Sequence, residues 1–210
     1  MAGQDWAAKL YPVAESQAGY FTRQQAAEVG VDSARLARQV AAGRLMRVAP
    51  GVYRLVQFPS SPHEDMMIAW LQTGPGSVIS HDSALALYDL SDALPNEAHV
   101  TVPRTASRRR SGMRLHTQRL MPREVTRRSG MAVTTPPRTI ADMAFAGLAE
   151  ELIAQAVQQA LVRGLALAEE IVAAGRTRRV REMLRRAVEE GSFWKSHTLP
   201  DEGHLHLRLR

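Results

Sequence analysis

The chain has 210 residues, of which 45% are hydrophobic and 23% charged, a composition typical of a folded protein of one or two domains. It contains no cysteine, which excludes disulfides, thiolate metal sites and thiol nucleophiles. The first residues lack the apolar run of a signal peptide, and no stretch has the length and apolarity of a membrane helix. A soluble, cytoplasmic protein without a membrane partner is therefore predicted.

The net charge of +6 is distributed unevenly along the chain. Residues 1–58 carry +3, residues 59–100 carry −6, and residues 101–140 carry +9 from ten arginines and one glutamate. Only two of the 27 basic residues are lysines, and the planar guanidinium of arginine suits phosphate better than an ammonium does. The basic segment indicates a surface for a polyanion, most simply nucleic acid, and a solvated charged loop is the alternative.

Residues 1–58 are predicted to form three short helices followed by a two-stranded ribbon. Apolar residues from Trp6 to Val13 recur at helical spacing and predict the first helix. The sequence TRQQ at 22–25 has the form of a capping box and opens a second helix. Gly30 is a natural end for that helix, because glycine readily adopts the left-handed conformation.

The third helix is capped by Asp32 or Ser33 and ends at Gly43, so that a tight turn separates two helices. Two β-prone runs follow at 44–48 and 52–56, with Ala-Pro-Gly between them as a type II turn. This order of elements predicts a winged helix-turn-helix. The alternative is a small helical module with no ligand, since such patterns produce false positives.

The third helix is predicted to be the recognition helix. Leu36 and Val40 form its buried stripe, which places Arg35, Arg38 and Ala42 on the opposite face. We expect this face to enter the major groove and the arginines of the ribbon to contact the flanking backbone or minor groove. The arginines of the basic segment would add phosphate contacts. The predicted DNA-binding residues are Thr22, Arg23, Gln24, Ser33, Arg35, Arg38, Gln39, Arg44, Arg47, Arg54, Arg104, Arg108, Arg109, Arg110 and Arg114.

Residues 59–192 are predicted to form a second, mixed domain, giving an α+β protein overall. The sequence PSSP at 59–62 marks the linker, and residues 193–210 form a tail that we expect to be disordered. Helices are expected around Met66–Leu71 and after Ser80, and again from Thr139 to Leu148, 150–162, 166–174 and 178–190. Strands are expected at 78–79, 98–102, 113–120 and 131–133, the last one stopped by Pro136 and Pro137.

Four segments of the chain resemble the AbiEi family of antitoxins from type IV toxin–antitoxin and abortive-infection operons. They are Phe21–Leu55, Ser80–Leu90, His99–Pro103 and Val133–Ala144, and the sequence RVAPGVY is the most specific part. The resemblance implies a protein that binds and represses its own promoter and neutralises a nucleotidyltransferase-type toxin, with direct contact to the toxin left open. A stand-alone winged-helix regulator without a toxin is the alternative.

No enzymatic activity, metal or cofactor is predicted. Ser80, His81 and Asp82 are consecutive and cannot form a catalytic relay, because neighbours on a helix point about 100° apart. Ser80 is expected to cap a helix instead. The histidines at 63, 81, 99 and 116 are scattered singly, without the spacing of a metal-binding motif. A nuclease remnant is disfavoured because no lysine accompanies the carboxylates Glu97 and Glu124.

Overall fold

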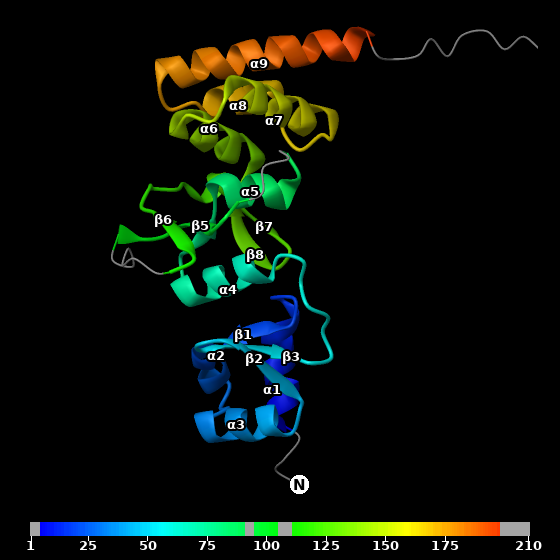
Figure 1. The fold of residues 1–210 in the computed structure, drawn as a ribbon, viewed down its shortest axis with the longest axis vertical. Helices are drawn as coiled ribbons and strands as arrows, with labels where there is room; N and C mark the ends of the chain where they lie inside the picture. Colours follow the sequence, from blue (N-terminus) through cyan, green and yellow to red (C-terminus); the bar gives the residue numbers. More distant parts are fainter. Residues whose placement is uncertain (1–4, 91–94, 105–110, 198–210) are drawn as a thin grey trace, which may run out of the picture.

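The structure, a computed structural model, describes residues 5–90, 95–104 and 111–197. In Figure 1 the chain runs along one long axis, from the N-terminal helices and a small sheet, through a second sheet, to a stack of C-terminal helices. This arrangement confirms the α+β class. None of the described helices is long and apolar enough to cross a membrane.

The N-terminal part has the predicted winged-helix order of elements. They are α1 (Asp5–Glu15), β1 (Tyr20–Thr22), α2 (Arg23–Glu28), α3 (Ser33–Ala41), β2 (Leu45–Ala49) and β3 (Val52–Leu55). The strands form an antiparallel sheet in the order β1-β3-β2. Strand β1 was not predicted, because three residues are too few to show an alternating pattern; pairing with β3 makes this segment a strand.

Local capping fixes the two helices of the helix-turn-helix as predicted. The Thr22 hydroxyl accepts a hydrogen bond from the Gln25 amide at 3.1 Å, and the Gln25 side chain accepts one from the Thr22 amide at 2.8 Å. The Asp32 carboxylate accepts from the Arg35 amide at 2.7 Å, so Asp32 rather than Ser33 caps α3. Gly51 has a φ of +78°, as a type II turn requires.

The second part contains a five-stranded mixed sheet in the order β6-β5-β4-β8-β7. Its elements are α4 (Glu64–Thr73), β4 (Val78–Ile79), α5 (His81–Tyr88), β5 (Ala98–Thr101), β6 (Met113–His116), β7 (Val125–Arg128) and β8 (Met131–Thr134). Strand β4 lies at the centre, antiparallel to β5 and parallel to β8, while β5 and β6 run parallel at the other side. Strand β7 pairs only with β8 among the described residues.

Strand β7 was missed in the sequence because its residues, VTRR, are half charged and show no apolar alternation. It pairs antiparallel with β8 across a turn of two residues, Ser129 and Gly130, whose φ values are +49° and +80°. Two consecutive positive φ values define a type I′ turn, the tightest connection of a β-hairpin. Pairing with the buried strand β8 therefore decides the structure of this segment.

Four helices complete the fold at the C-terminal end. They are α6 (Pro136–Ala146), α7 (Glu150–Val162), α8 (Ala168–Ala174) and α9 (Arg178–His197). The expected start of α6 at Thr139 was too late, because the prolines occupy its first turn, where no amide partner is needed. Helix α9 continues past residue 190, so 193–197 are helical and not part of a disordered tail; residues 198–210 lie outside the described residues.

The winged helix is packed firmly against the second part. Tyr20 and Val52 belong to the large core that is otherwise built from residues 67–187, although the winged helix also has a core of its own around Leu10 and Leu36. The Tyr20 hydroxyl donates to Glu64 at 2.7 Å and accepts from the Ser61 amide at 3.1 Å. A domain boundary at 59–62 remains a prediction.

Candidate nucleic-acid interface

The outer face of α3 is open and carries arginine, as the sequence predicted. Leu36 is fully buried on the inner side, whereas Ser33 and Arg38 are exposed and Arg35 is half-buried. Between them lie Ala34 and Ala37, which are also exposed and small enough to let another surface approach the helix closely. Figure 1 places α3 at the free end of the molecule, where no other element covers it.

Strand β2 and the residue before it extend this exposed surface with two further arginines. Arg44 and Arg47 are both exposed, and Met46 between them is 47% exposed. Arg44 donates through Nε to the Gln39 side chain at 2.6 Å, which holds its guanidinium beside the end of α3. Gln39 itself is buried, so it positions Arg44 and does not belong to the exposed surface.

Arg54 also does not belong to this surface. Its side chain is only 9% exposed and donates to the Phe58 carbonyl oxygen. Its guanidinium lies 5.9 Å from the centre of the Tyr20 ring and 4.0 Å from a Glu64 carboxylate oxygen. The structure therefore places Arg54 at the contact between the winged helix and α4, where it is not available to DNA.

The turn between β2 and β3 is directed toward the second part. The Pro50 carbonyl accepts a hydrogen bond from the Gln72 side chain of α4 at 3.3 Å, and the Gly51 carbonyl accepts from the Arg23 amide at 2.8 Å. The wing of a winged helix can contact DNA only when its tip is free. Here the tip, the Pro50–Gly51 turn, is fixed by hydrogen bonds to Gln72 and Arg23. Among the predicted arginines of the ribbon, Arg44 and Arg47 keep exposed side chains and Arg54 does not.

The start of α2 contains three predicted residues, of which one is half-buried and two are exposed. Thr22 is half-buried and uses its hydroxyl in the capping box, so its role is to start α2. Arg23 and Gln24 are exposed, and Gln24 donates to Glu28 at 3.1 Å. Both line a groove of about 1190 Å³ between the winged helix and the second part, and not the α3 surface.

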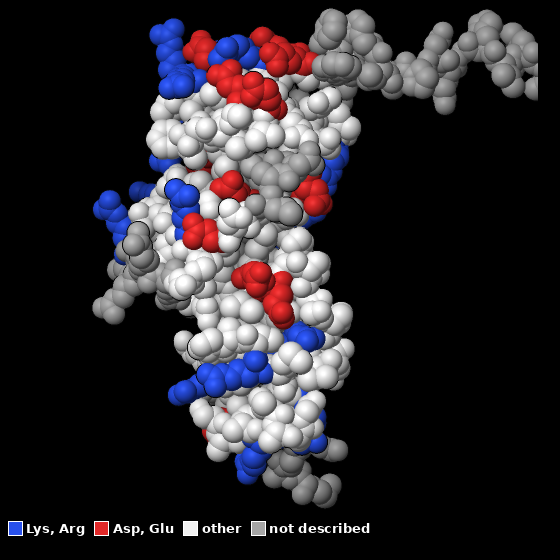
Figure 2. Space-filling view, in the orientation of Figure 1, with Lys and Arg blue, Asp and Glu red and all other residues white. Residues whose placement is uncertain are grey.

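The two described arginines predicted in the second part, Arg104 and Arg114, are not brought to α3. Arg104 and Arg114 are exposed, and Arg114 lies on β6, an edge of the second sheet (Figure 1). Arg108, Arg109 and Arg110 lie outside the described residues. On the face shown in Figure 2, Lys and Arg side chains lie over the winged helix and again over the second part, and Asp and Glu side chains lie over α4 between them. On this face acidic side chains therefore separate the arginines of the winged helix from those of the second part.

Three histidines that are scattered in the sequence meet in the second part. His81 begins α5, and His99 and His116 lie on the paired strands β5 and β6. The rings of His81 and His116 stack with centroids 3.6 Å apart and an interplanar angle of 8°. Burial lowers the pKa of His81 to about 3 and that of His116 to about 4, with the neighbouring histidines acting in the same direction. We call these three residues and Asp82 the histidine cluster.

The histidine cluster does not have the geometry of a catalytic triad. Asp82 pairs with His99, 3.0 Å between Oδ2 and Nδ1, and not with His81. Ser80 Oγ lies 3.0 Å from His81 Nδ1 but is fully buried, and it accepts from the Thr101 hydroxyl at 2.8 Å. Ser80 occupies the N-cap position of α5, as expected, but its side chain makes no capping hydrogen bond.

The histidine cluster also does not hold its nitrogens around a common point. Because the His81 and His116 rings are stacked in parallel planes, the lone pairs of their nitrogens lie in these planes side by side. The lone pairs of metal ligands must instead converge on one metal ion. Within the described residues, no group of three or more His, Asp or Glu has a metal-binding arrangement. Packing of His81 and His116 as buried neutral rings, beside the His99–Asp82 pair, is the simplest description of these contacts.

An open α3, a three-stranded sheet and flanking arginines define a winged-helix DNA-binding protein of the transcriptional-regulator class. Residues 9–56 match the family model described as "Transcriptional regulator, AbiEi antitoxin". The match confirms, for the winged helix, the resemblance to AbiEi antitoxins seen in the sequence. The match ends before the second part and assigns no role to it.

Two further comparisons add little to this assignment. No curated protein sequence matches the chain significantly. Among solved structures, the crystal structure of the RV2827C protein from Mycobacterium tuberculosis is similar over 87% of this chain and 81% of its own length, with 13% identity and a TM-score of 0.41. This similarity is too distant to support an inference about this chain.

Proposed function

We propose that the protein is a cytoplasmic antitoxin that binds the promoter of its own toxin–antitoxin operon, represses it, and neutralises a nucleotidyltransferase-type toxin. The observation that carries the DNA-binding part is the outer face of α3, where exposed Arg38 stands among small residues at the free end of the molecule. The match of residues 9–56 to a family of transcriptional regulators also supports DNA binding.

In this proposal α3 enters the major groove. Ser33 and Arg38 face base edges, and the small side chains of α3 allow its backbone to approach them. Arg44 and Arg47 lie beside the helix and contact the flanking phosphates. The held tip of the ribbon excludes the usual insertion of a wing, so specificity comes mainly from α3.

Replacement of single arginines tests the DNA-binding part. We expect Arg38→Ala to weaken binding to the promoter duplex by about 1–3 kcal/mol and to a scrambled duplex by less, because a base contact is lost. Arg179→Ala in α9 removes the same charge at the opposite end of the molecule and serves as the matched control. Fluorescence anisotropy with both duplexes gives the two affinities. Equal effects of the two substitutions would overturn the proposed interface.

Co-expression tests the antitoxin part. We expect the chain to restore growth of cells that express the toxin encoded beside it, and Arg38→Ala to retain this rescue, because α3 serves DNA. Absence of rescue by the intact, expressed chain would favour the alternative, a stand-alone regulator. The family match does not distinguish the antitoxin from the stand-alone regulator, since it covers only the winged helix.

A further inference from the structure

Strand β7 offers unpaired backbone groups at the edge of the second sheet. In a hairpin with a two-residue turn, the closing pair is hydrogen-bonded and the following pair is not. Here Arg128 and Met131 close the turn, so the next pair, Arg127 and Ala132, is the non-hydrogen-bonded one. The amide and carbonyl of Arg127 therefore point away from β8, toward a side on which no further strand pairs within the described residues.

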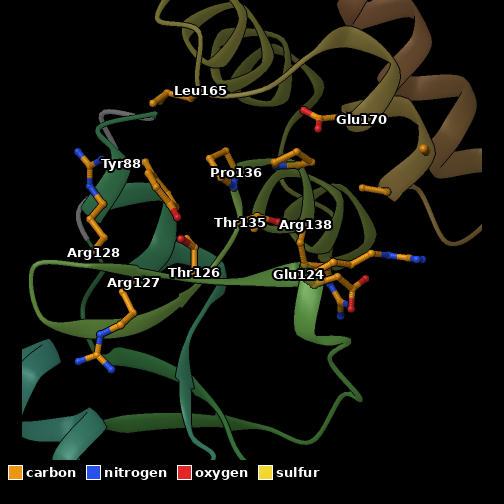
Figure 3. A pocket seen from close by; sticks show the side chains of 14 residues that line it. Tyr88, Glu124, Thr126, Arg127, Arg128, Thr135, Pro136, Arg138, Leu165 and Glu170 are labelled. Atoms are coloured by element: carbon orange, nitrogen blue, oxygen red, sulfur yellow. The ribbon is translucent and has the colours of Figure 1, made fainter.

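Hollows lie on both faces of this hairpin. On one face, Thr126 and Arg128 line a cavity of about 690 Å³ whose apolar wall includes Tyr88, Pro136 and Leu165 (Figure 3). On the other face, Val125 and Arg127 line the groove of about 1190 Å³ that borders the winged helix. Successive residues of an added strand would point alternately to the two faces, and so into the two hollows.

The charge around β7 favours an acidic partner. Arg123 and Arg128 line the cavity, Arg127 borders both the cavity and the groove, and Arg123 and Arg127 are exposed. The acidic residues of the same cavity are already engaged. Glu124 accepts from the Met121 amide at 2.7 Å and pairs with Arg138 at 3.0 Å, and Glu170 accepts from the Leu167 amide at 2.8 Å. Arg127 donates to the Gly130 and Ser16 carbonyls and Arg128 to the Leu87 carbonyl, and these oxygens carry no charge. The positive charges of the three arginines are therefore not neutralised by the carboxylates of the cavity, which favours carboxylates from outside.

We propose that β7 is a docking edge for an extended, acidic segment of a partner protein, which adds a strand to the sheet and places alternating apolar side chains into the cavity. Main-chain hydrogen bonds to Arg127 supply the register, and the arginines select acidic sequences. Exposed arginines also protect sheet edges from unwanted pairing, and the apolar wall behind them distinguishes a docking site from such protection. This proposal concerns the second part and does not rest on DNA binding by α3.

A labelled peptide tests the docking edge. The probe is a fluorescein-labelled peptide of about eight residues with alternating valine and glutamate, and its control has lysine in place of glutamate. We expect the acidic peptide to bind the full-length chain at least about tenfold more tightly than the basic one, because each carboxylate–arginine hydrogen bond contributes. Arg123→Glu should weaken the acidic peptide by about tenfold and leave the affinity for promoter DNA unchanged.

A second pair of variants isolates the backbone contact. Arg127→Ala removes the side chain, and Arg127→Pro removes the side chain and the outward amide, which proline permits at a sheet edge. We expect the proline variant to bind the acidic peptide several-fold more weakly than the alanine variant, with equal thermal stability. Unfolding by circular dichroism checks the stability. If proline is destabilising, Arg123→Glu remains the deciding variant.

Three outcomes would overturn the proposal. The first is equal binding of the acidic and basic peptides. The second is competition of duplex DNA with the peptide together with an equal loss of DNA affinity in Arg123→Glu, which would make this a DNA surface. The third is a change from dimer to monomer in Arg127→Pro, which would show that the edge pairs with a second copy of the chain. Failure of promoter binding alone would affect only the function proposed for α3.

Discussion

At the scale of single residues, His81 has both a left-handed backbone and a buried, titratable ring, and each of these costs free energy. Its φ of +52° lies in the left-handed region, which costs an L-residue about 1–2 kcal/mol. Its ring is buried against His116, with His99, Asp82 and Arg138 as the other charged or titratable neighbours. The hydrogen bonds around it, to Ser80 at 3.0 Å and to Gln118 at 3.3 Å, are those of a neutral imidazole.

The histidine cluster makes the stability depend on pH. Unfolded His81 binds a proton near pH 6.5, and folded His81 only near its pKa of about 3, so between these values the unfolded state binds more protons. The free energy of unfolding should therefore fall by about 1.4 kcal/mol per pH unit for this residue as the pH decreases below 6.5. Asp82, whose pKa is lowered by His99, acts only below its ordinary value of 3.8.

Urea unfolding at pH 7.5 and 5.0 measures this dependence. We expect His81→Asn to lose less stability between the two values than the wild type, because asparagine tolerates the left-handed backbone and does not titrate. His63→Gln, outside the cluster, should behave as the wild type. An unchanged pH dependence in His81→Asn would show that His81 is not buried as a neutral ring.

At the scale of elements, the β7–β8 hairpin joins the two parts of the molecule. Arg127 donates to the Gly130 carbonyl at 2.8 Å and to the Ser16 carbonyl at the end of α1 at 3.4 Å. A Cβ atom on Gly130 would lie 3.0 Å from Gln17 Cα. The turn therefore approaches the backbone of α1 so closely that only glycine fits without a shift.

Substitution of Gly130 separates this contact from the cost of the turn. Gly130→Ala should be destabilising by about 1–2 kcal/mol for its positive φ and by more for the backbone contact. Gly164→Ala is the matched control, since its φ is +63° and no atom lies within 4 Å of its Cβ position. Urea denaturation compares the two variants, and equal losses of stability would contradict the close packing of the hairpin on α1.

At the scale of the whole molecule, the structure reduces the number of arginines that face DNA. Arg54 is buried and the described arginines of the second part lie away from α3, which leaves Arg35, Arg38, Arg44 and Arg47. Each neutralised phosphate contributes about −0.9 to the slope of log K against log salt concentration. If each of these four guanidinium groups neutralises one phosphate charge, Arg38 included although it faces base edges, the slope reaches at most about −3.6.

Salt titration of promoter binding checks this number. Between 50 and 200 mM salt we expect the affinity to fall on the order of a hundredfold. Anisotropy measurements over this range give the slope directly. A slope steeper than about −6 would bring arginines of the segment 101–140 into the interface. A flat dependence would contradict a phosphate-contacting surface altogether.

The sequence by itself determined the elements whose causes are local. The capping box at Thr22, the Asp32 cap and the Pro50–Gly51 turn each depend on residues within four positions, and all three are present. Helical periodicity likewise placed α3 and its outer arginine. These local features were sufficient to predict the winged helix, and the AbiEi family model matches the same part of the chain.

Only the tertiary structure decided what depends on partners distant in the chain. The charged segment at β7 is a strand because β8 pairs with it, and Arg54 is buried because Tyr20 and Glu64 meet there. The histidine cluster exists because β5 and β6 pair in parallel beside the start of α5. Long-range pairing and burial leave no periodic signal in the segments they join, and for that physical reason the sequence alone did not reveal them.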